Sequence, residues 1–347
     1  MDSAARATTT DTARGAALAR PSTRPASRAE QLAELRAGLS RPQKELSSRF
    51  FYDERGSELF EEITRLPEYY PTRAEREILE RHMGTWAERL RSRTVVELGA
   101  GSAAKSRLIL DALRAAGSLH SYVPVDVSAD FLAATARRLR DEYPGLRVEP
   151  AAGDFTRRIH LPDRLPSPSL LVFLGGTVGN FAAPEDARLV ARFAALMRPG
   201  DHLLLGTDLR KDPAVLEAAY DDAQGVTAEF NLNALRVVNE QFGADFDVAD
   251  FGHRAFYDRE LHRIEMHLVA ERDVRVRVPG AGDFHIARGE SIRTEVSCKY
   301  DRPSVRAMLA AAGLRLADWR TDADGRFALS LSVLADDEGG ATAVRAD

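Results

Sequence analysis

Residues 94–101, TVVELGAG, form the stretch that decides the fold. An apolar run leads into Glu97 and then into Gly99 and Gly101, which predicts a buried strand that ends in a tight turn. Residues 106–116 have the pattern of a helix. Glycines let a ligand approach the backbone because no Cβ is in the way, and the free N–H groups at a helix start favour an anionic group. The stretch therefore predicts a ligand site at the end of a strand.

Three more strand-like segments follow along the chain. They are residues 121–126, which end in Asp126, residues 148–155, which end in Asp154 and Phe155, and residues 170–181. An acid at the end of the second strand binds ribose hydroxyls in doubly wound folds. The alternation of strand and helix over residues 91–210 predicts a parallel sheet with helices on both faces.

The order of the motifs, E-L-G-x-G, then D, then G-D-F, resembles the S-adenosylmethionine site of class I methyltransferases. Ala104 stands where the dinucleotide fingerprint has its third glycine. The resemblance implies that the first glycines face the methionine part of the cofactor. It also implies that Asp126 holds the ribose and that Asp154 with Phe155 frames the adenine. The implied fold is α/β, with a seven-stranded, Rossmann-like sheet.

Composition and charge describe an ordinary globular chain. The 347 residues are 44% hydrophobic and 29% charged, which is enough for a large core. The net charge of −5 and the lack of a dense Lys/Arg run argue against a nucleic-acid partner. The single cysteine, Cys298, excludes an internal disulfide and fits a reducing, cytoplasmic location. The histidines lack metal-ligand spacing, so we expect no metal site, and we expect a monomer.

The two ends of the chain differ from the rest. Residues 1–28 have almost no large apolar side chains, so we expect a disordered tail, with a transit peptide as the alternative. Residues 337–347 are expected to be a C-terminal tail. No stretch reaches the ~18 apolar residues that a membrane span needs, so no membrane partner is expected.

The sequence changes character after about residue 210. Residues 211–300 combine a helical part with alternating stretches such as HRIEMHLVA and VRVRV, which predict antiparallel strands. A helix at 304–312 and a hairpin around 323–325 are expected to complete the large sheet. We therefore expect a cofactor-binding core of residues 76–210 and 301–336, and a second, α+β substrate-binding domain of residues 29–75 and 211–300.

Residues 51–75 contain a concentration of aromatic side chains: Tyr52, Phe60, Tyr69 and Tyr70. Rings in this number can form a cage for an ammonium group, although packing under a loop is the commoner use. Ser57 follows a glycine turn, which predicts a helix with Ser57 as its N-cap.

The full set of motifs indicates a narrower family within the class I methyltransferases. The chain carries, in one order, YDERGSELFEEITRLPEYYPTRAE, ELGAGSAAKSRLIL, PVDVS, GDF, FLGGTVGN, LLLGTDLRKD, AYDDAQGVTAEFN, IEM and TEVSCKY. Over roughly residues 45–335 it closely resembles the L-histidine Nα-methyltransferases of ergothioneine biosynthesis. The resemblance implies an S-adenosylmethionine-dependent enzyme that trimethylates L-histidine, a small-molecule substrate, to hercynine.

The resemblance also implies roles for individual residues. The cofactor is carried on positions that match Gly99, Lys105, Asp126, Asp154 and Phe155. Tyr52 matches a tyrosine near the reacting centre. The histidine contacts divide by functional group: Asn180 and the backbone near Gly175 for the α-amino group, Tyr69 and Tyr220 for the carboxylate, and Glu295 with Ser297 for the imidazole. Met266 together with Glu295 matches the histidine-type pattern. The glycine loop reads Ala-Gly-Ser-Ala-Ala where family members often carry Ser-Gly-Thr-Ser-Glu, so contacts to the methionine carboxylate rest more on backbone.

The residue types fit the chemistry without the resemblance. Methyl transfer from a sulfonium to an amine needs a neutral amine, with the reacting atoms aligned at about 3 to 3.5 Å. The enzyme then positions the reactants and excludes water. Glu295 can accept an imidazole N–H, and a carboxylate that is buried without such a partner disfavours apolar side chains.

Plainer interpretations stay open when the resemblance is set aside. Asp126 and Asp154 suit a helix cap or turn, Lys105 suits an exposed helix face, and Glu295 suits the solvent face of a strand. Two other functions also stay open: a methyltransferase for another amino acid or small amine, and a regulatory module that has lost catalysis. The second would lack the amine-side residues, yet this chain has Tyr52, Tyr69, Asn180 and Tyr220.

Overall fold

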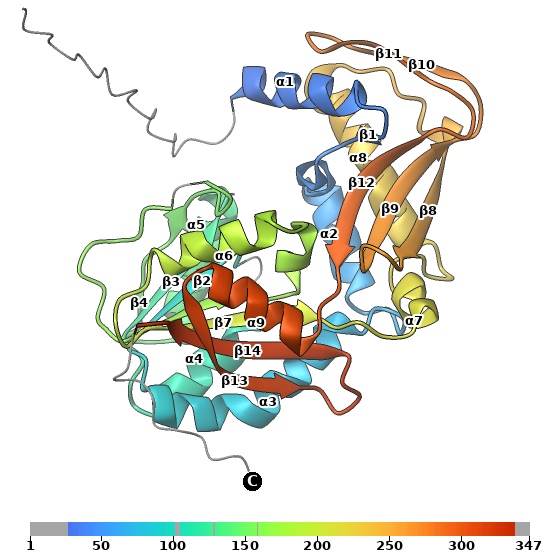
Figure 1. Ribbon diagram of the computed structural model, residues 1–347. Coiled ribbons are helices and arrows are strands. Elements are labelled where there is room, and N and C mark those ends of the chain that lie inside the picture. The colour runs from blue at the N-terminus through green and yellow to red at the C-terminus, as the bar shows by residue number, and fades with distance from the viewer. Residues whose placement is uncertain (1–26, 101–104, 128, 158, 337–347) are drawn as a thin grey trace, which may run out of the picture.

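The computed structural model describes residues 27–100, 105–127, 129–157 and 159–336. Nearly all of the expected tail at 1–28, all of the expected tail at 337–347 and the glycine-loop residues 101–104 lie outside the described residues. Figure 1 shows two parts: a large sheet with helices on both faces, and a smaller sheet with helices beside it.

The large sheet has the strand order β13-β14-β7-β6-β2-β3-β4, with β5 also paired to β3. Its strands are β2 (Thr94–Leu98), β3 (Ser121–Asp126), β4 (Arg147–Val148), β5 (Ala151–Ala152), β6 (Ser169–Phe173), β7 (His202–Asp208), β13 (Leu314–Thr321) and β14 (Phe327–Leu334). Strands β2 to β7 pair in parallel, and β14 pairs antiparallel with β7 and β13. The predicted class I methyltransferase sheet is confirmed.

Two expected strands are shorter than predicted. The third is split into β4 and β5, because Pro150 lies between them and a proline cannot donate to the ladder. The fourth ends at Phe173, because Gly175 and Gly176 take φ values of +77° and +69° in the left-handed region. The chain then forms the short 3₁₀ helix η2 (Thr177–Asn180).

Alternate residues of the strands face two separate cores, as the period of a strand requires. Val95 faces the side covered by α3 (Pro71–Leu90), α4 (Ser106–Ala115) and α5 (Ala129–Glu142). Val96 faces the side covered by α6 (Glu185–Ala194) and α9 (Arg302–Ala311). Burial on both faces explains why the strands have uninterrupted apolar runs.

The smaller sheet has the order β1-β12-β9-β8. Its elements and those packed near it are α1 (Arg28–Leu39), β1 (Lys44–Glu45), η1 (Ser48–Phe51), α2 (Glu54–Ile63), α7 (Pro213–Ala218), α8 (Val226–Phe242), η3 (Val248–Asp250), β8 (Phe251–Asp258), β9 (Arg263–Ala270), β10 (Val274–Val278), β11 (Gly282–Ile286) and β12 (Ser291–Cys298). The antiparallel pairing of β8, β9 and β12 confirms the predicted strands. One apolar core joins these segments, of which one group precedes β2 in the sequence and the other lies between β7 and β13.

The helix α2 begins earlier than predicted, and Ser57 is not its N-cap. Asp53 caps the helix, with its Oδ1 accepting the N–H of Gly56 at 2.7 Å. Gly56 lies inside the helix, and the position requires glycine because a Cβ there would lie 1.6 Å from the carbonyl oxygen of Phe51. The glycine therefore allows close packing inside the first turn and does not mark a turn before the helix.

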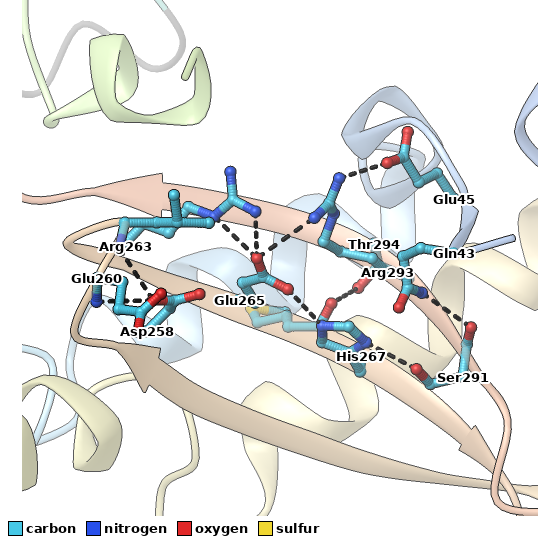
Figure 2. Close-up of polar contacts among 12 residues, drawn as sticks. Gln43, Glu45, Asp258, Glu260, Arg263, Glu265, His267, Ser291, Arg293 and Thr294 are labelled. Atoms are coloured by element: carbon cyan, nitrogen blue, oxygen red, sulfur yellow. Dashed lines mark hydrogen bonds and ion pairs between the residues drawn. The ribbon is translucent and has the colours of Figure 1, made fainter. Parts of the chain in front are cut away.

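A polar network ties β9 to β12 (Figure 2). The carboxylate of Glu265 accepts from Arg263 Nε at 2.8 Å and from Arg293 Nη1 at 3.3 Å. Its other oxygen lies 2.8 Å from Nε2 of His267, whose Nδ1 lies 2.9 Å from the hydroxyl of Ser291. His267 is thus a buried structural histidine.

Candidate active site

The strands β2, β3, β5, β6 and β7 run parallel, so their carboxyl ends meet at one edge of the large sheet. Ligands of open α/β sheets bind outside this edge. The residues that follow these strands include Gly99, Phe155, Gly175 and Leu209, with Asp126 and Asp208 as the last residues of β3 and β7. The edge thus gathers Gly99, Asp126, Phe155 and Gly175 of the residues predicted from the sequence.

Gly99 and Phe155 lie at the centre of the predicted cofactor side. Gly99 has a φ of +73°, and its N–H donates to the carbonyl of Val125 at 2.8 Å, next to Asp126. A Cβ at Gly99 would lie 3.4 Å from the Phe155 ring, which packs edge-to-face on Phe173 with 5.2 Å between centroids. An exposed glycine between an aromatic ring and an acidic residue suits a flat, hydroxylated ligand.

Asp154 is held in its own turn. Its Oδ1 accepts from the N–H of Thr156 at 2.9 Å and from the Thr156 hydroxyl at 2.5 Å, and its Oδ2 lies 3.6 Å from Arg157 Nε. The turn interpretation of Asp154 therefore holds, and its contact with adenine stays a prediction.

Lys105 is not an exposed helix-face lysine. Its Nζ forms an ion pair with Oε2 of Glu75, which is fully buried, and Oε1 of Glu75 accepts the N–H of Gly175 at 2.8 Å. A Cβ at Gly206 would lie 2.4 Å from Oε1 of Glu75, so the glycine in β7 makes room for this carboxylate. The sequence alone assigns no role to Glu75. Gly206, a glycine inside an apolar strand, was the sequence feature that indicated a side chain packed closely against β7.

A second buried carboxylate, Glu97, lies below the glycine turn. It accepts hydrogen bonds from the hydroxyls of Ser106 and Tyr122. Burial raises its pKa to about 7, although both hydrogen bonds act in the opposite direction. These bonds fix the end of β2 against α4 and β3.

The aromatic side chains of the 51–75 stretch pack together with Tyr220. Ring centroids lie 6.0 Å apart for Tyr52 and Phe60, and 6.3 Å apart both for Phe60 and Tyr69 and for Tyr69 and Tyr220, all edge-to-face. Tyr70 is separate from this group, because its hydroxyl donates to Asp208 at 2.8 Å. Tyr52 keeps 53% of its surface exposed, so its ring is open to a ligand.

Glu295 lies within electrostatic reach of Tyr52, Tyr69 and Tyr220. It pairs across the sheet with the buried Met266 and makes no hydrogen bond or ion pair with the residues that the structure describes. Burial raises its pKa to about 7, against the attraction of Lys299. A half-buried carboxylate that lacks a donor is suited to a ligand N–H.

Asn180 lies where the two parts of the molecule meet. It ends η2, which packs so closely on β12 that a Cβ at Gly179 would lie 2.7 Å from the carbonyl oxygen of Cys298. The half-buried Asn180 side chain has no hydrogen bond to the described part of the chain.

The chain matches the family of histidine-specific, S-adenosylmethionine-dependent methyltransferases over residues 31–334. It belongs to this family. It is 50% identical to the histidine N-alpha-methyltransferase of Mycobacterium tuberculosis, over 86% of this chain and 92% of that protein. It is 31% identical to ergothioneine biosynthesis protein 1 of Schizosaccharomyces pombe, over 78% of this chain and 36% of that longer protein. The solved CcbJ methyltransferase from Streptomyces caelestis is 16% identical, with a TM-score of 0.42 over 75% of this chain and 90% of that one.

The described residues of this methyltransferase contain no group of three or more His, Cys, Asp or Glu side chains that could hold a metal ion. None of its described helices is long and apolar enough to cross a membrane. The predicted site residues offer hydroxyls, carboxylates, an amide and aromatic rings, which can bind and orient organic reactants.

Proposed function

We propose that this methyltransferase transfers three methyl groups in turn from S-adenosylmethionine to the α-amino nitrogen of L-histidine, giving hercynine, as the first step of ergothioneine biosynthesis. The observation that carries the proposal is the carboxylate of Glu295, which lies among tyrosines and lacks a donor in the described structure. A neutral imidazole supplies the N–H that this carboxylate needs. The relative that is half identical is named as a histidine N-alpha-methyltransferase, which supports histidine as the methyl acceptor.

The amine would bind at the end of β6. Because the N–H of Gly175 is already bonded to Glu75, the backbone there offers its carbonyl oxygen, which accepts an N–H of the amine. The side-chain oxygen of Asn180 is a second acceptor. Two acceptors on the N–H groups would leave the nitrogen lone pair directed away from them and free to react.

The rest of histidine would lie toward the smaller sheet. We assign Tyr69 and Tyr220 to the carboxylate and Glu295 with Ser297 to the imidazole. Met266 would fill the space beside Glu295, and Tyr52 would lie near the reacting nitrogen. Each transfer forms a nitrogen–carbon bond while the carbon–sulfur pair of electrons stays with sulfur, so the amine must lose a proton before each attack.

The cofactor would bind along the neighbouring strand ends. Gly99 leaves room at the turn, Asp126 would accept from the ribose hydroxyls, and Phe155 with Asp154 would flank the adenine. Lys105 would lie near the methionine carboxylate. S-adenosylmethionine supplies the activated methyl group, and the residues around it hold the two reactants in line.

We also propose a domain boundary at Tyr70 and not at residue 75, because the buried Ala74 of α3 belongs to the large-sheet core. The substrate-binding domain would then comprise residues 27–70 and 212–300. A cytoplasmic location and a monomeric state remain predictions.

The test is purified enzyme with S-adenosylmethionine and each of the twenty amino acids, with products identified by mass. Histidine is expected to gain three methyl groups and the other amino acids far fewer. Faster methylation of another amino acid, or a histidine product methylated on the ring, would contradict the proposal.

A further inference from the structure

Lys299 is buried where the end of β12 meets the end of β7. Its Nζ lies 2.7 Å from Oδ2 of Asp208, 2.8 Å from Oγ of Ser297 and 3.0 Å from the hydroxyl oxygen of Tyr220. Its side chain has 0% of its surface exposed. The lysine thus contacts two residues assigned to different functional groups of histidine.

These contacts determine how the hydroxyl protons are used. A lysine ammonium has three donors and no acceptor, so both hydroxyl oxygens must accept from Lys299. The hydroxyls of Tyr220 and Ser297 also lie 2.8 Å apart, so one of them donates to the other. Only one of the two O–H groups then remains, and the described residues give it no acceptor.

Asp208 keeps Lys299 in place. It is buried, it accepts from the Tyr70 hydroxyl at 2.8 Å, and its Oδ1 lies 2.6 Å from Nζ of Lys211. Burial opposes the charged form, but the charges of Lys299 and Lys211 outweigh it and lower the pKa of Asp208. A charged Asp208 without Lys299 would itself attract the nearby hydroxyl protons.

We propose that Lys299 is a positioning residue that leaves one hydroxyl donor of the Tyr220–Ser297 pair for an acceptor atom of histidine, so that only one of the two contacts assigned above, Tyr220 to the carboxylate or Ser297 to the imidazole, is a hydrogen bond donated to the substrate. This inference rests on the proposed function. With Glu295 as the acceptor, the site then presents one donor and one acceptor. This pair disfavours a ligand that would place a second N–H against the two hydroxyls.

The test compares Lys299→Met with Lys211→Met, which makes the same chemical change on the other side of Asp208 without touching either hydroxyl. Binding of L-histidine is measured by calorimetry at saturating S-adenosylhomocysteine, whose own affinity is measured separately. Lys299→Met is expected to weaken histidine binding at least tenfold and S-adenosylhomocysteine binding less than twofold. Lys211→Met is expected to weaken histidine binding less than twofold.

A double variant, Asp208→Asn with Lys299→Met, removes both charges and guards against misfolding. Its stability is expected to recover while histidine binding stays at least fivefold weaker than in the wild type. Equal effects of the two single lysine variants, or wild-type histidine affinity in the double variant, would overturn the inference. A wild-type enzyme that binds no histidine would instead contradict the proposed function, and the inference with it.

Discussion

Glu295 has a carboxylate with no donor among the described residues, and it is the side chain of this site that most directly indicates a substrate N–H. Burial makes its charged form costly, as its pKa of about 7 shows, and no described donor compensates. The bulge in β12 between Arg293 and Glu295 shifts the register just before this residue. Glu295 and Ser297 still lie two residues apart on one face of the strand and can converge on one ring.

We expect Glu295→Ala to weaken histidine binding by roughly 2 kcal/mol or more, because a hydrogen bond to a charged group is lost. Larger, less polar amino acids should lose less, or gain, because no carboxylate is left without a partner. The measurement is turnover of histidine and of tryptophan by both enzymes at equal cofactor concentration. If both substrates fall by the same factor, Glu295 does not select the substrate.

Asp126 is proposed to bind the cofactor, so its removal should weaken cofactor binding and leave histidine binding unchanged. Asp126→Ala is expected to weaken S-adenosylmethionine binding by about 1.5 to 3 kcal/mol, because charge-assisted hydrogen bonds to the ribose are lost. Histidine binding at saturating cofactor should change little. Calorimetric titration checks both affinities, with Asp141→Ala on the exposed face of α5 as the control. Unchanged cofactor affinity would remove Asp126 from the site.

At the scale of elements, β9 and β12 are joined by ion pairs between side chains as well as by backbone hydrogen bonds. Burial disfavours the charged form of Glu265, but hydrogen bonds from His267 and Arg263 and the charges of Arg263 and Arg293 outweigh it and lower its pKa to about 2. Because this pKa lies below the ordinary value, the network stabilises the fold above about pH 4.5, and the contribution is lost as the pH falls through about 2.

Glu265→Gln should therefore reduce the free energy of unfolding at pH 7 by up to about 3 kcal/mol. The difference in unfolding free energy between this variant and the wild type should shrink as the pH is lowered toward 2. Urea unfolding at several pH values measures it. Glu88→Gln, an exposed position on α3, should change stability by less than about 0.5 kcal/mol at every pH. A pH-independent deficit in Glu265→Gln would show that packing, and not charge, holds these strands.

At the scale of the whole molecule, the proposed active site lies where the two parts meet. Of its proposed residues, Gly99, Asp126 and Asn180 belong to the large-sheet part, and Tyr69 and Glu295 belong to the smaller part. The smaller part also includes α1 near the start of the chain, where Arg28 Nη1 donates to the carbonyl of Gln241 at 2.6 Å. The part of the chain before α1 is predicted from composition to be dispensable.

We expect deletion of residues 1–26 to leave activity and stability unchanged. Deletion of residues 1–28 should cost about 1 kcal/mol of stability, because Ser27 forms a capping box with Glu30 at the start of α1. Activity assays and thermal unfolding of the two truncated proteins distinguish these outcomes. A large loss of activity with the shorter deletion would contradict the assignment of a tail.

The sequence by itself predicted the main strand segments of the large sheet, the glycine turn at Gly99 and the parallel, class I methyltransferase fold. These features depend on local patterns: an apolar run, a glycine that allows a positive φ, and an acid directly after a strand. The limits of the local pattern are visible at Pro150 and Gly175, which end or divide strands that apolar character alone extends too far.

Only the tertiary structure decided which charged groups work together. Glu75 and Gly175 are 100 residues apart in sequence, and Tyr70 and Asp208 are 138 apart, yet each pair is joined by a hydrogen bond. Lys299 resembles any other lysine beside a strand until the two sheets pack and exclude water from it. A buried charge needs partners, and those partners come from whatever the fold places beside it, which no local pattern in the sequence records.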